Sequence, residues 1–243
     1  MRYSICLAAL LAGTAFATTA SAAEKGAYIG LSVGVAKLGT TDIGYYDAGG
    51  TFGGSGATDR ADGRLSFKSA AEFKGTVGYD FGTIRADLEI AYARSSTKAL
   101  TVDSINGSPV TLSPGDISDI CDYLEASNCA GAGNAITVDG SRLRQLSALG
   151  SLWVDLPIGK SVTPYVGAGL GVSGFEADGE GKAQFAWQLG AGVAFNISET
   201  TAITIDYRHR EAKGTNIAYD SVSGFDIGKL KTDSVSAGVR FTF

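Results

Sequence analysis

The stretch TIRADLEIAYA, residues 83–93, alternates two kinds of side chain along its whole length. Its even-numbered residues are all Ile, Ala, Leu or Tyr, whereas Arg85, Asp87 and Glu89 occupy odd positions. Successive side chains of a β-strand point to opposite faces. The stretch therefore predicts a strand with one wholly apolar face and one charged face.

The same alternation returns in seven further segments, so the sequence predicts eight strands. Leu149 and Trp153 interrupt the polar face of one of them, which is the least regular of the set. The seven segments are residues 27–37, 72–81, 146–156, 164–174, 184–196, 202–210 and 234–243.

The connections between these strands alternate in length. They are short after the second, fourth and sixth strands and longer after the first, third, fifth and seventh. The two longest run from Gly39 to about Ser66 and from near Ser95 to Ser141. Short turns at one end and long loops at the other are typical of outer-membrane barrels. The sequence thus predicts an all-β fold, an eight-stranded antiparallel up-and-down transmembrane β-barrel.

A soluble barrel of the lipocalin type would have similar strands but an apolar interior. Aromatic residues on the apolar face distinguish the two. Two aromatic rows that flank an aliphatic band favour a surface that faces lipid, where a closed barrel pairs every backbone polar group. The expected outer row contains Trp187 and Tyr92, and the expected inner row contains Phe81, Phe195, Phe241 and Phe243.

The first residues predict a secretory signal peptide, residues 1–22, with cleavage after Ala22 or Ala23. Arg2 precedes an apolar core of roughly a dozen residues, which is shorter than the about 20 that a membrane-spanning helix needs. The barrel domain then covers residues 23–243, and the predicted location is the outer membrane of a Gram-negative cell.

Export would leave two of the three cysteines, Cys121 and Cys129, since Cys6 lies in the signal peptide. An even number of cysteines in an exported chain indicates a disulfide. The spacing fits no familiar zinc pattern, and the single histidine, His209, lies far away in sequence. We therefore expect a disulfide that closes a small loop.

An eight-stranded barrel has an interior just wide enough for side chains to fill. Both signs of charge are expected there, which favours an ion-paired plug and leaves a narrow or gated pore as the alternative. The turn DFG, residues 80–82, would set Lys74 opposite Glu89 and Thr76 opposite Asp87, with a slip of two residues as the open alternative. The expected interior charges are Glu72, Lys74, Arg85, Asp87, Glu89, Asp155, Asp206, Arg208 and Arg240.

Residues 169–174, GLGVSG, match the G-x-G-x-x-G fingerprint of dinucleotide-binding loops. No helix pattern follows, and Gly167, Gly169 and Gly171 recur with the period of a strand. We interpret them as inner-face positions that leave room for side chains such as Arg208. No cofactor is predicted.

Four segments of this chain resemble eight-stranded outer-membrane proteins of the opacity-like and 25-kDa surface-antigen type. The resemblance implies an outer-membrane protein with variable surface loops. It also implies that Phe243, supported by Phe241, is similar to the terminal signal read by the barrel-assembly machinery. The four segments are GYDFGTIRADLEIAYAR, TPYVGAGLGVSGF, FAWQLGAGVAFNISETTAITIDYRHR and DSVSAGVRFTF.

Three classes of function follow: a structural or surface-interaction protein, a narrow porin-like channel, and an envelope enzyme. The first class is favoured. The first long loop contains Tyr45, Tyr46 and Phe52, which could contact a partner. The alternative is that this loop is flexible and solvated. No catalytic or metal residue is predicted, because His209 has no serine two positions away and Asp206 has the opposite parity.

The expected partners are outer-membrane lipid and lipopolysaccharide, the barrel-assembly machinery, and a host or surface ligand that contacts the loops. The net charge of −5 and the lack of a basic run argue against nucleic acid.

Overall fold

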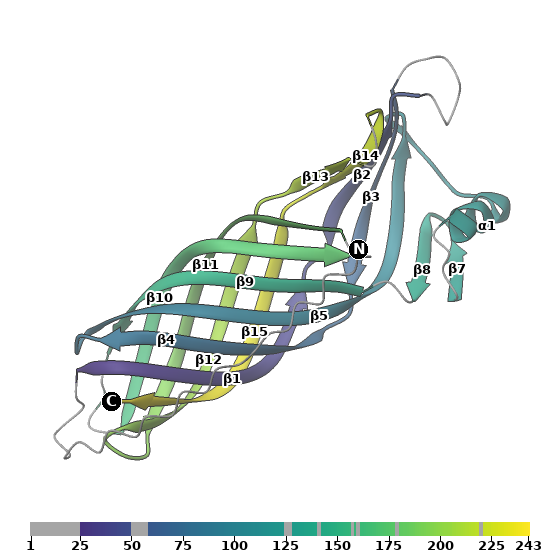
Figure 1. Ribbon diagram of the computed structural model, residues 1–243. Helices are drawn as coiled ribbons and strands as arrows, with labels where there is room; N and C mark the ends of the chain where they lie inside the picture. The colour runs from purple at the N-terminus through teal and green to yellow at the C-terminus, as the bar shows by residue number, and fades with distance from the viewer. Residues whose placement is uncertain are drawn as a thin grey trace, which may run out of the picture.

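Eight strands of the computed structural model close into a barrel (Figure 1). The structure describes residues 25–49, 58–123, 128–139, 142–156, 158, 161–177, 180–218 and 221–243. Each barrel strand pairs antiparallel with its neighbours, and the last strand pairs with the first. The predicted eight-stranded antiparallel barrel is confirmed. Its strands are β1 (Gly26–Leu38), β4 (Ala70–Asp80), β5 (Ile84–Ile105), β9 (Arg142–Asp155), β10 (Val162–Ala177), β11 (Glu180–Asn196), β12 (Thr201–Ala212) and β15 (Leu230–Thr242).

The other elements lie beyond one end of the barrel, away from the carboxyl terminus (Figure 1). Several of them continue the barrel as one sheet with the order β13-β14-β2-β3-β5, to which β8 and β7 are added. We call β13, β14, β2, β3, β8, β7 and residues 97–105 of β5 the loop-end sheet. The additional elements are β2 (Thr41–Asp47), β3 (Asp59–Phe67), β6 (Ser108–Pro109), α1 (Pro114–Tyr123), β7 (Asn128–Ala132), β8 (Ala135–Asp139), β13 (Thr215–Ala218) and β14 (Ser223–Ile227).

The expectation of a longer connection after the fifth strand is wrong. Here β10 continues to Ala177 and β11 begins at Glu180, with Phe175 opposite Lys182 and Glu176 opposite Gly181. Polar residues continue the ladder because backbone pairing does not require an apolar face.

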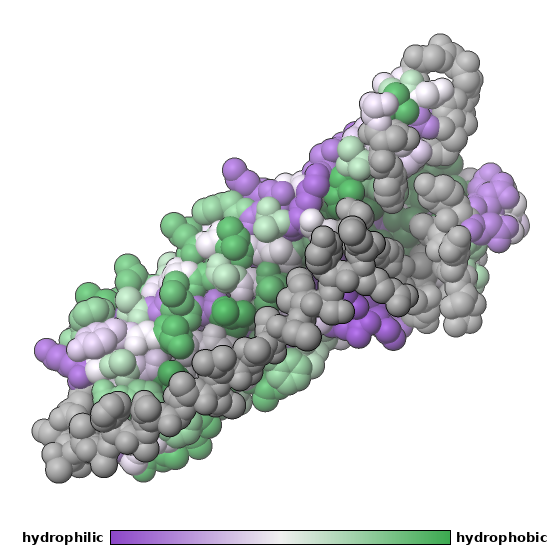
Figure 2. Space-filling model, in the orientation of Figure 1, coloured by the Kyte–Doolittle hydropathy of each residue, from purple (hydrophilic) through white to green (hydrophobic). Residues whose placement is uncertain are grey.

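The apolar face of the barrel strands points outward. Leu31, Leu88 and Leu170 are 67%, 63% and 62% exposed, whereas Glu72 and Gln188 on the inner face are 0% exposed. Figure 2 shows hydrophobic residues spread over the barrel part of the visible face. This orientation is the reverse of a soluble barrel and is the one that lipid requires. Within the ranges given above, no helix is long and apolar enough to cross a membrane.

Glycines on the inner face make room for large interior side chains. A Cβ atom on Gly190 would lie 2.5 Å from Nη1 of Arg208 and 2.8 Å from Cη2 of Trp153. On the outward face, a Cβ atom on Gly75 would meet only the Leu31 side chain, at 4.0 Å. The interpretation of inner-face glycines as space for neighbours such as Arg208 agrees with these contacts.

We expect Gly190→Ala to lower the free energy of unfolding by about 1–3 kcal/mol, because the new methyl group overpacks the interior. The matched control, Gly75→Ala, should change it by less than about 0.5 kcal/mol. Urea unfolding of the barrel in lipid vesicles measures both. Equal midpoints for the two variants would show that the interior has spare room at Gly190.

Candidate functional site

The most tightly bound charges in the interior are Arg85 on β5 and Asp155 on β9. Arg85 Nε lies 2.8 Å from Asp155 Oδ2, and Arg85 Nη2 lies 2.8 Å from Asp155 Oδ1. Both side chains are 5% exposed. The guanidinium also lies 4.8 Å from the ring centre of Tyr165 and 5.7 Å from that of Tyr28. A bidentate pair with aromatic contacts is the arrangement that best offsets the cost of burying charge.

A second group of charges joins strands on opposite sides of the barrel. Lys74 Nζ on β4 lies 2.9 Å from Asp206 Oδ1 on β12, and both side chains are nearly fully buried. Arg208 Nε lies 3.3 Å from Asp206 Oδ1 and 3.6 Å from Glu89 Oε2. Each carboxylate thus faces at least one cation, which an ion-paired interior requires.

Arg210 completes this group and was missed among the expected interior charges. Its Nη1 lies 3.1 Å from Glu72 Oε1, and its Nη2 lies 3.5 Å from Glu89 Oε1. Arg210 shares the parity of Arg208 and Asp206, which was the signal available in the sequence. We refer to Glu72, Lys74, Arg85, Glu89, Asp155, Asp206, Arg208 and Arg210 as the barrel network.

The expected register between β4 and β5 is wrong by two residues. Lys74 lies opposite Ala91, and Thr76 lies opposite Glu89. The turn explains the shift: Asp80 Oδ1 accepts a hydrogen bond from the Gly82 amide at 2.7 Å, and Gly82 has φ +110°. The turn residues are Gly82 and Thr83, since the Phe81 amide donates to the Ile84 carbonyl oxygen at 2.9 Å. A left-handed glycine and an Asx turn favour this position of the turn.

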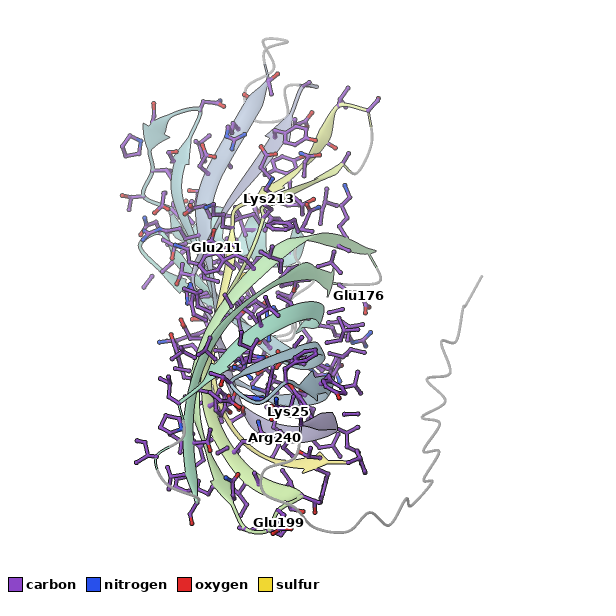
Figure 3. The ribbon with its side chains drawn as sticks, turned by 90° about the vertical axis from the view of Figure 1, so that its left-hand side faces the viewer. Lys25, Glu176, Glu199, Glu211, Lys213 and Arg240 are labelled. Carbon is purple, nitrogen blue, oxygen red and sulfur yellow. A yellow bond between two sulfur atoms is a disulfide. The ribbon has the colours of Figure 1, made fainter. Side chains whose placement is uncertain are left out.

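Asp87 and Arg240 are held by aromatic residues. The Asp87 carboxylate accepts hydrogen bonds from the Tyr28 hydroxyl at 2.7 Å and from Trp153 Nε1 at 2.9 Å. Arg240 lies 5.7 Å from the centre of the Tyr28 ring, toward the end of the barrel with the short turns (Figure 3). Arg208 lies 3.9 Å from the Trp153 ring. Trp153 interrupts the alternation of the sequence because it is an aromatic residue on the inner face, where it contacts Asp87 and Arg208.

A small cavity remains between these side chains. It measures about 40 Å³ and is lined in part by Arg85, Asp87, Arg208 and Arg240. In the described part of the chain, Asp87 Oδ1 and Arg240 Nη1 have no hydrogen-bond partner. A polar cavity of this size holds only a few water molecules, which would satisfy such atoms.

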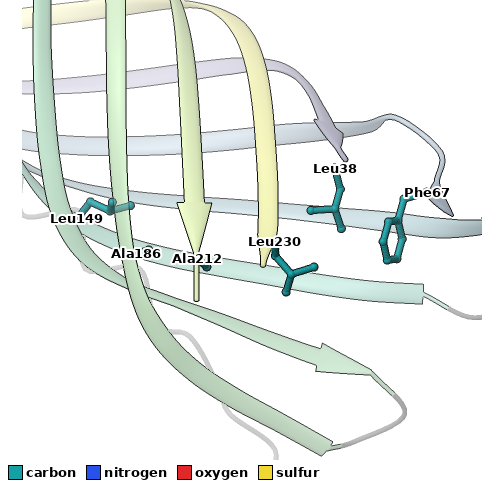
Figure 4. Packing of buried hydrophobic residues seen from close by; sticks show 6 residues of the cluster. All are labelled: Leu38, Phe67, Leu149, Ala186, Ala212 and Leu230. Atoms are coloured by element: carbon teal, nitrogen blue, oxygen red, sulfur yellow. The ribbon is translucent and has the colours of Figure 1, made fainter. Parts of the chain in front are cut away.

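An apolar layer lies across the barrel at its loop end (Figure 4). It contains Leu149, the other residue that interrupted the alternation, which is 1% exposed. Its buried side chains come from β1, β3, β9, β11, β12 and β15. The buried members are Leu38, Phe67, Leu149, Ala186, Ala212 and Leu230.

The loop-end sheet carries ion pairs on one face. Arg64 donates to both carboxylate oxygens of Asp103 at 2.8 Å, and Arg60 Nη1 lies 2.9 Å from Asp226 Oδ2. Hydrogen bonds from Asn216 and Arg60 lower the pKa of Asp226 below its usual value. The Asp226 pair is therefore formed at neutral pH and is lost only when acid protonates this carboxyl group.

The second long loop has a hydrophobic core of its own. Val102 on β5, Leu112 and Ile136 on β8 are buried together, and Ile117 of α1 packs against them. A disulfide joins Cys121 of α1 to Cys129 of β7, with their Cα atoms 5.6 Å apart. This segment is consequently a folded unit and not a loose loop.

The first long loop contributes Tyr45 and Tyr46 to β2. The Tyr45 ring centre lies 5.2 Å from that of Phe225, and the Tyr46 hydroxyl accepts a hydrogen bond from Asn216 Nδ2 at 3.1 Å. The alternative of a flexible loop does not describe these two tyrosines. Phe52 lies outside the described residues.

His209 lies on the outward face near the loop end. Its Nδ1 lies 2.8 Å from Asp233 Oδ1 on β15, and its ring centre lies 5.6 Å from that of Trp187. Asp233 was not foreseen as its partner, because the two residues meet only through the pairing of β12 and β15. In the described ranges, no three His, Cys, Asp or Glu side chains are placed to hold a metal ion.

Of the two segments expected to direct export and assembly, the structure describes only the carboxyl-terminal one. The signal peptide, residues 1–22, lies outside the described residues. Phe241 and Phe243 are 41% and 57% exposed at the end of β15, near the short turns. Their role as an assembly signal stays a prediction.

A family profile described as an outer membrane protein beta-barrel domain matches residues 6–243. The chain belongs to this family. A protein from Brucella abortus (strain 2308) is 27% identical over 220 residues, covering 74% of this chain and 70% of that protein. A protein from Brucella suis biovar 1 (strain 1330) is 28% identical over the same shares. Both relatives are uncharacterised.

Two solved structures resemble this outer-membrane barrel. Neisserial surface protein A has a TM-score of 0.48 at 16% identity, covering 89% of this chain and 97% of that one. OprG from Pseudomonas aeruginosa has a TM-score of 0.49 at 14% identity, covering 92% of this chain and 100% of that one.

In outer-membrane barrels the short turns face the periplasm and the long loops face outward. The loop-end sheet therefore lies on the outside of the cell.

Proposed function

We propose that this protein is a non-conducting anchor that presents the loop-end sheet for contacts at the cell surface. The observation that carries the proposal is a division of the molecule into two folded parts. The interior is filled by the barrel network and an apolar layer, whereas the long loops form a sheet with its own core and disulfide. Ordered surface segments on a rigid scaffold are where binding function concentrates.

The channel alternative requires a continuous aqueous path. The paired charges, the small size of the 40 Å³ cavity and the apolar layer support a closed interior. We expect the purified full-length protein in planar bilayers to give no large, steady conductance steps. A porin of established conductance, inserted in the same bilayers, is the positive control. Steady open channels would contradict the anchor proposal.

Surface contact is tested by displaying the chain on cells and measuring adhesion to plates coated with fibronectin, laminin or heparin and to epithelial monolayers. A trimmed chain would replace residues 44–62 and 101–135 by short turns, since Ile43 pairs with Gly63 and Leu100 with Ile136. Trimming should abolish adhesion while the barrel still shows heat-modifiable gel mobility. Equal adhesion of trimmed and intact chains would contradict a surface-contact role for the sheet.

The disulfide provides a milder comparison for the same assay. Cys121→Ser/Cys129→Ser removes the cross-link and leaves the composition of the loop nearly unchanged. The chain-entropy model assigns a loop of this length roughly 2–3 kcal/mol of stabilisation. We expect reduced adhesion and faster proteolysis near α1, with an unchanged barrel.

The proposal also includes the route to the membrane. Residues 1–22 are proposed to direct export, and Phe241 with Phe243 to engage the barrel-assembly machinery. The outward position of Phe241 on the final strand supports the second point. No nucleic-acid partner is proposed for a chain with a net charge of −5.

A further inference from the structure

Three arginines meet on the outward face of β5 and β9. The strand register sets Arg94 directly opposite Arg144, and Ser96 opposite Arg142. All three arginines are exposed, whereas Ser95 between Arg94 and Ser96 is buried in the interior. We call Arg94, Arg142 and Arg144 the arginine cluster.

The arginine cluster carries more positive charge than its neighbours balance. Arg144 Nη1 lies 2.8 Å from Glu176 Oε1 on β10. Among the residues that the structure describes, neither Arg94 nor Arg142 takes part in a salt bridge. Like charges directly opposite one another in a sheet are destabilising. An external anion would remove this repulsion.

The position of the arginine cluster indicates which anion it meets. Tyr92 and Leu146, which pair one step closer to the membrane centre, are 40% and 54% exposed on the same face. They belong to the outward apolar band, so the arginines stand where that band ends on the outer side. Figure 3 shows Glu176, the partner of Arg144, on this loop-end side of the barrel. This is the level of lipid headgroups in the outer leaflet.

We propose that the arginine cluster binds the phosphate groups of lipid A, the glycolipid anchor of lipopolysaccharide. Two guanidinium groups side by side offer forks that match phosphate oxygens bidentately. The acyl chains of the same lipid would then cover Tyr92 and Leu146. The site concerns the membrane lipid and is independent of any ligand of the loop-end sheet.

Native mass spectrometry of the intact barrel, titrated with bisphosphorylated lipid A, tests the proposal. Arg94→Gln/Arg142→Gln keeps the Arg144–Glu176 pair and should weaken lipid A binding by about tenfold or more, the loss expected when charge-assisted hydrogen bonds are removed. Lys182→Gln/Lys213→Gln removes the same charge from β11 and the segment after β12 and should bind as the unmodified protein does. Arg94→Lys/Arg142→Lys, which keeps both charges, should retain most of the binding.

The source of the phosphate is tested with the same protein. Dephosphorylated lipid A should bind the unmodified barrel weakly. Its affinity should be no higher than the affinity of Arg94→Gln/Arg142→Gln for bisphosphorylated lipid A. Inorganic phosphate should neither bind detectably nor displace lipid A; displacement would assign the site to free phosphate and overturn the proposal. Equal weakening in Lys182→Gln/Lys213→Gln would also overturn it, because it would show a general charge effect. Heat-modifiable gel mobility establishes that each variant is folded.

Discussion

Asp155→Leu is expected to lower the free energy of unfolding of the barrel by about 3–5 kcal/mol. The substitution removes both oxygens that Arg85 bonds at 2.8 Å and leaves a guanidinium that is 5% exposed without its counter-ion. The tyrosine rings beside Arg85 do not replace a carboxylate, since a cation–π contact contributes only about 2 kcal/mol when desolvated. Urea unfolding in vesicles, followed by tryptophan fluorescence, measures the loss.

The double variant Arg85→Met/Asp155→Leu is the control for this result. Replacing a whole buried ion pair by apolar side chains of similar size is often neutral or stabilising. We expect the double variant to be more stable than Asp155→Leu alone. If both were equally destabilised, lost packing and not the unpaired charge would explain the effect.

Lys74→Glu should destabilise the barrel by about 3 kcal/mol, because it removes one of the two cations beside Asp206 and buries a second carboxylate there. Lys74 Nζ lies 2.9 Å from Asp206 Oδ1, so the new carboxylate at position 74 would face the carboxylate of Asp206. Melting of the folded form in heat-modifiability gels measures the loss. Unchanged melting would count against this ion pair.

Charge reversal identifies the partner of Lys74. Lys74→Glu/Asp206→Lys should recover part of the stability, because it restores the pair with reversed charges although the new lysine lies beside Arg208. Lys74→Glu/Glu89→Lys should recover less, because its new lysine faces both Arg208 and Arg210 and the carboxylate of Asp206 still faces the new one at position 74. Rescue by the Glu89 variant alone would favour the register that sets Lys74 opposite Glu89 over the one in the structure.

The alternation of side chains made the barrel predictable. In segments such as residues 83–93, the period of two is a local property that does not depend on which strand lies next to which. This period predicts that Leu88 points outward and Glu89 points into the interior. It also predicts the number of barrel strands. The pair of cysteines in an exported chain likewise predicted the Cys121–Cys129 disulfide that the structure contains.

The long loops were harder to predict for a physical reason. Their strands are short, such as the five residues of β7 and of β8, and the pairing of β3 with β5 shifts register twice. Short and irregular strands leave too few residues for an alternation to be recognised. Their stability comes from packing, as for Ile136 against Leu112, and not from a pattern within one segment.

Which side chains face lipid and which face the interior can be inferred from the amino-acid sequence, because alternation needs only the local backbone. Which charges meet depends on how the strands assemble. Lys74 and Asp206 are 132 residues apart and face one another because eight strands close into a ring with one register. The same closure stacks Arg208 on Trp153 and sets Arg94 opposite Arg144. A turn at Gly82 and Thr83 shifts every pair between β4 and β5 by two residues from the expected register, and the sequence of one strand alone does not specify that shift.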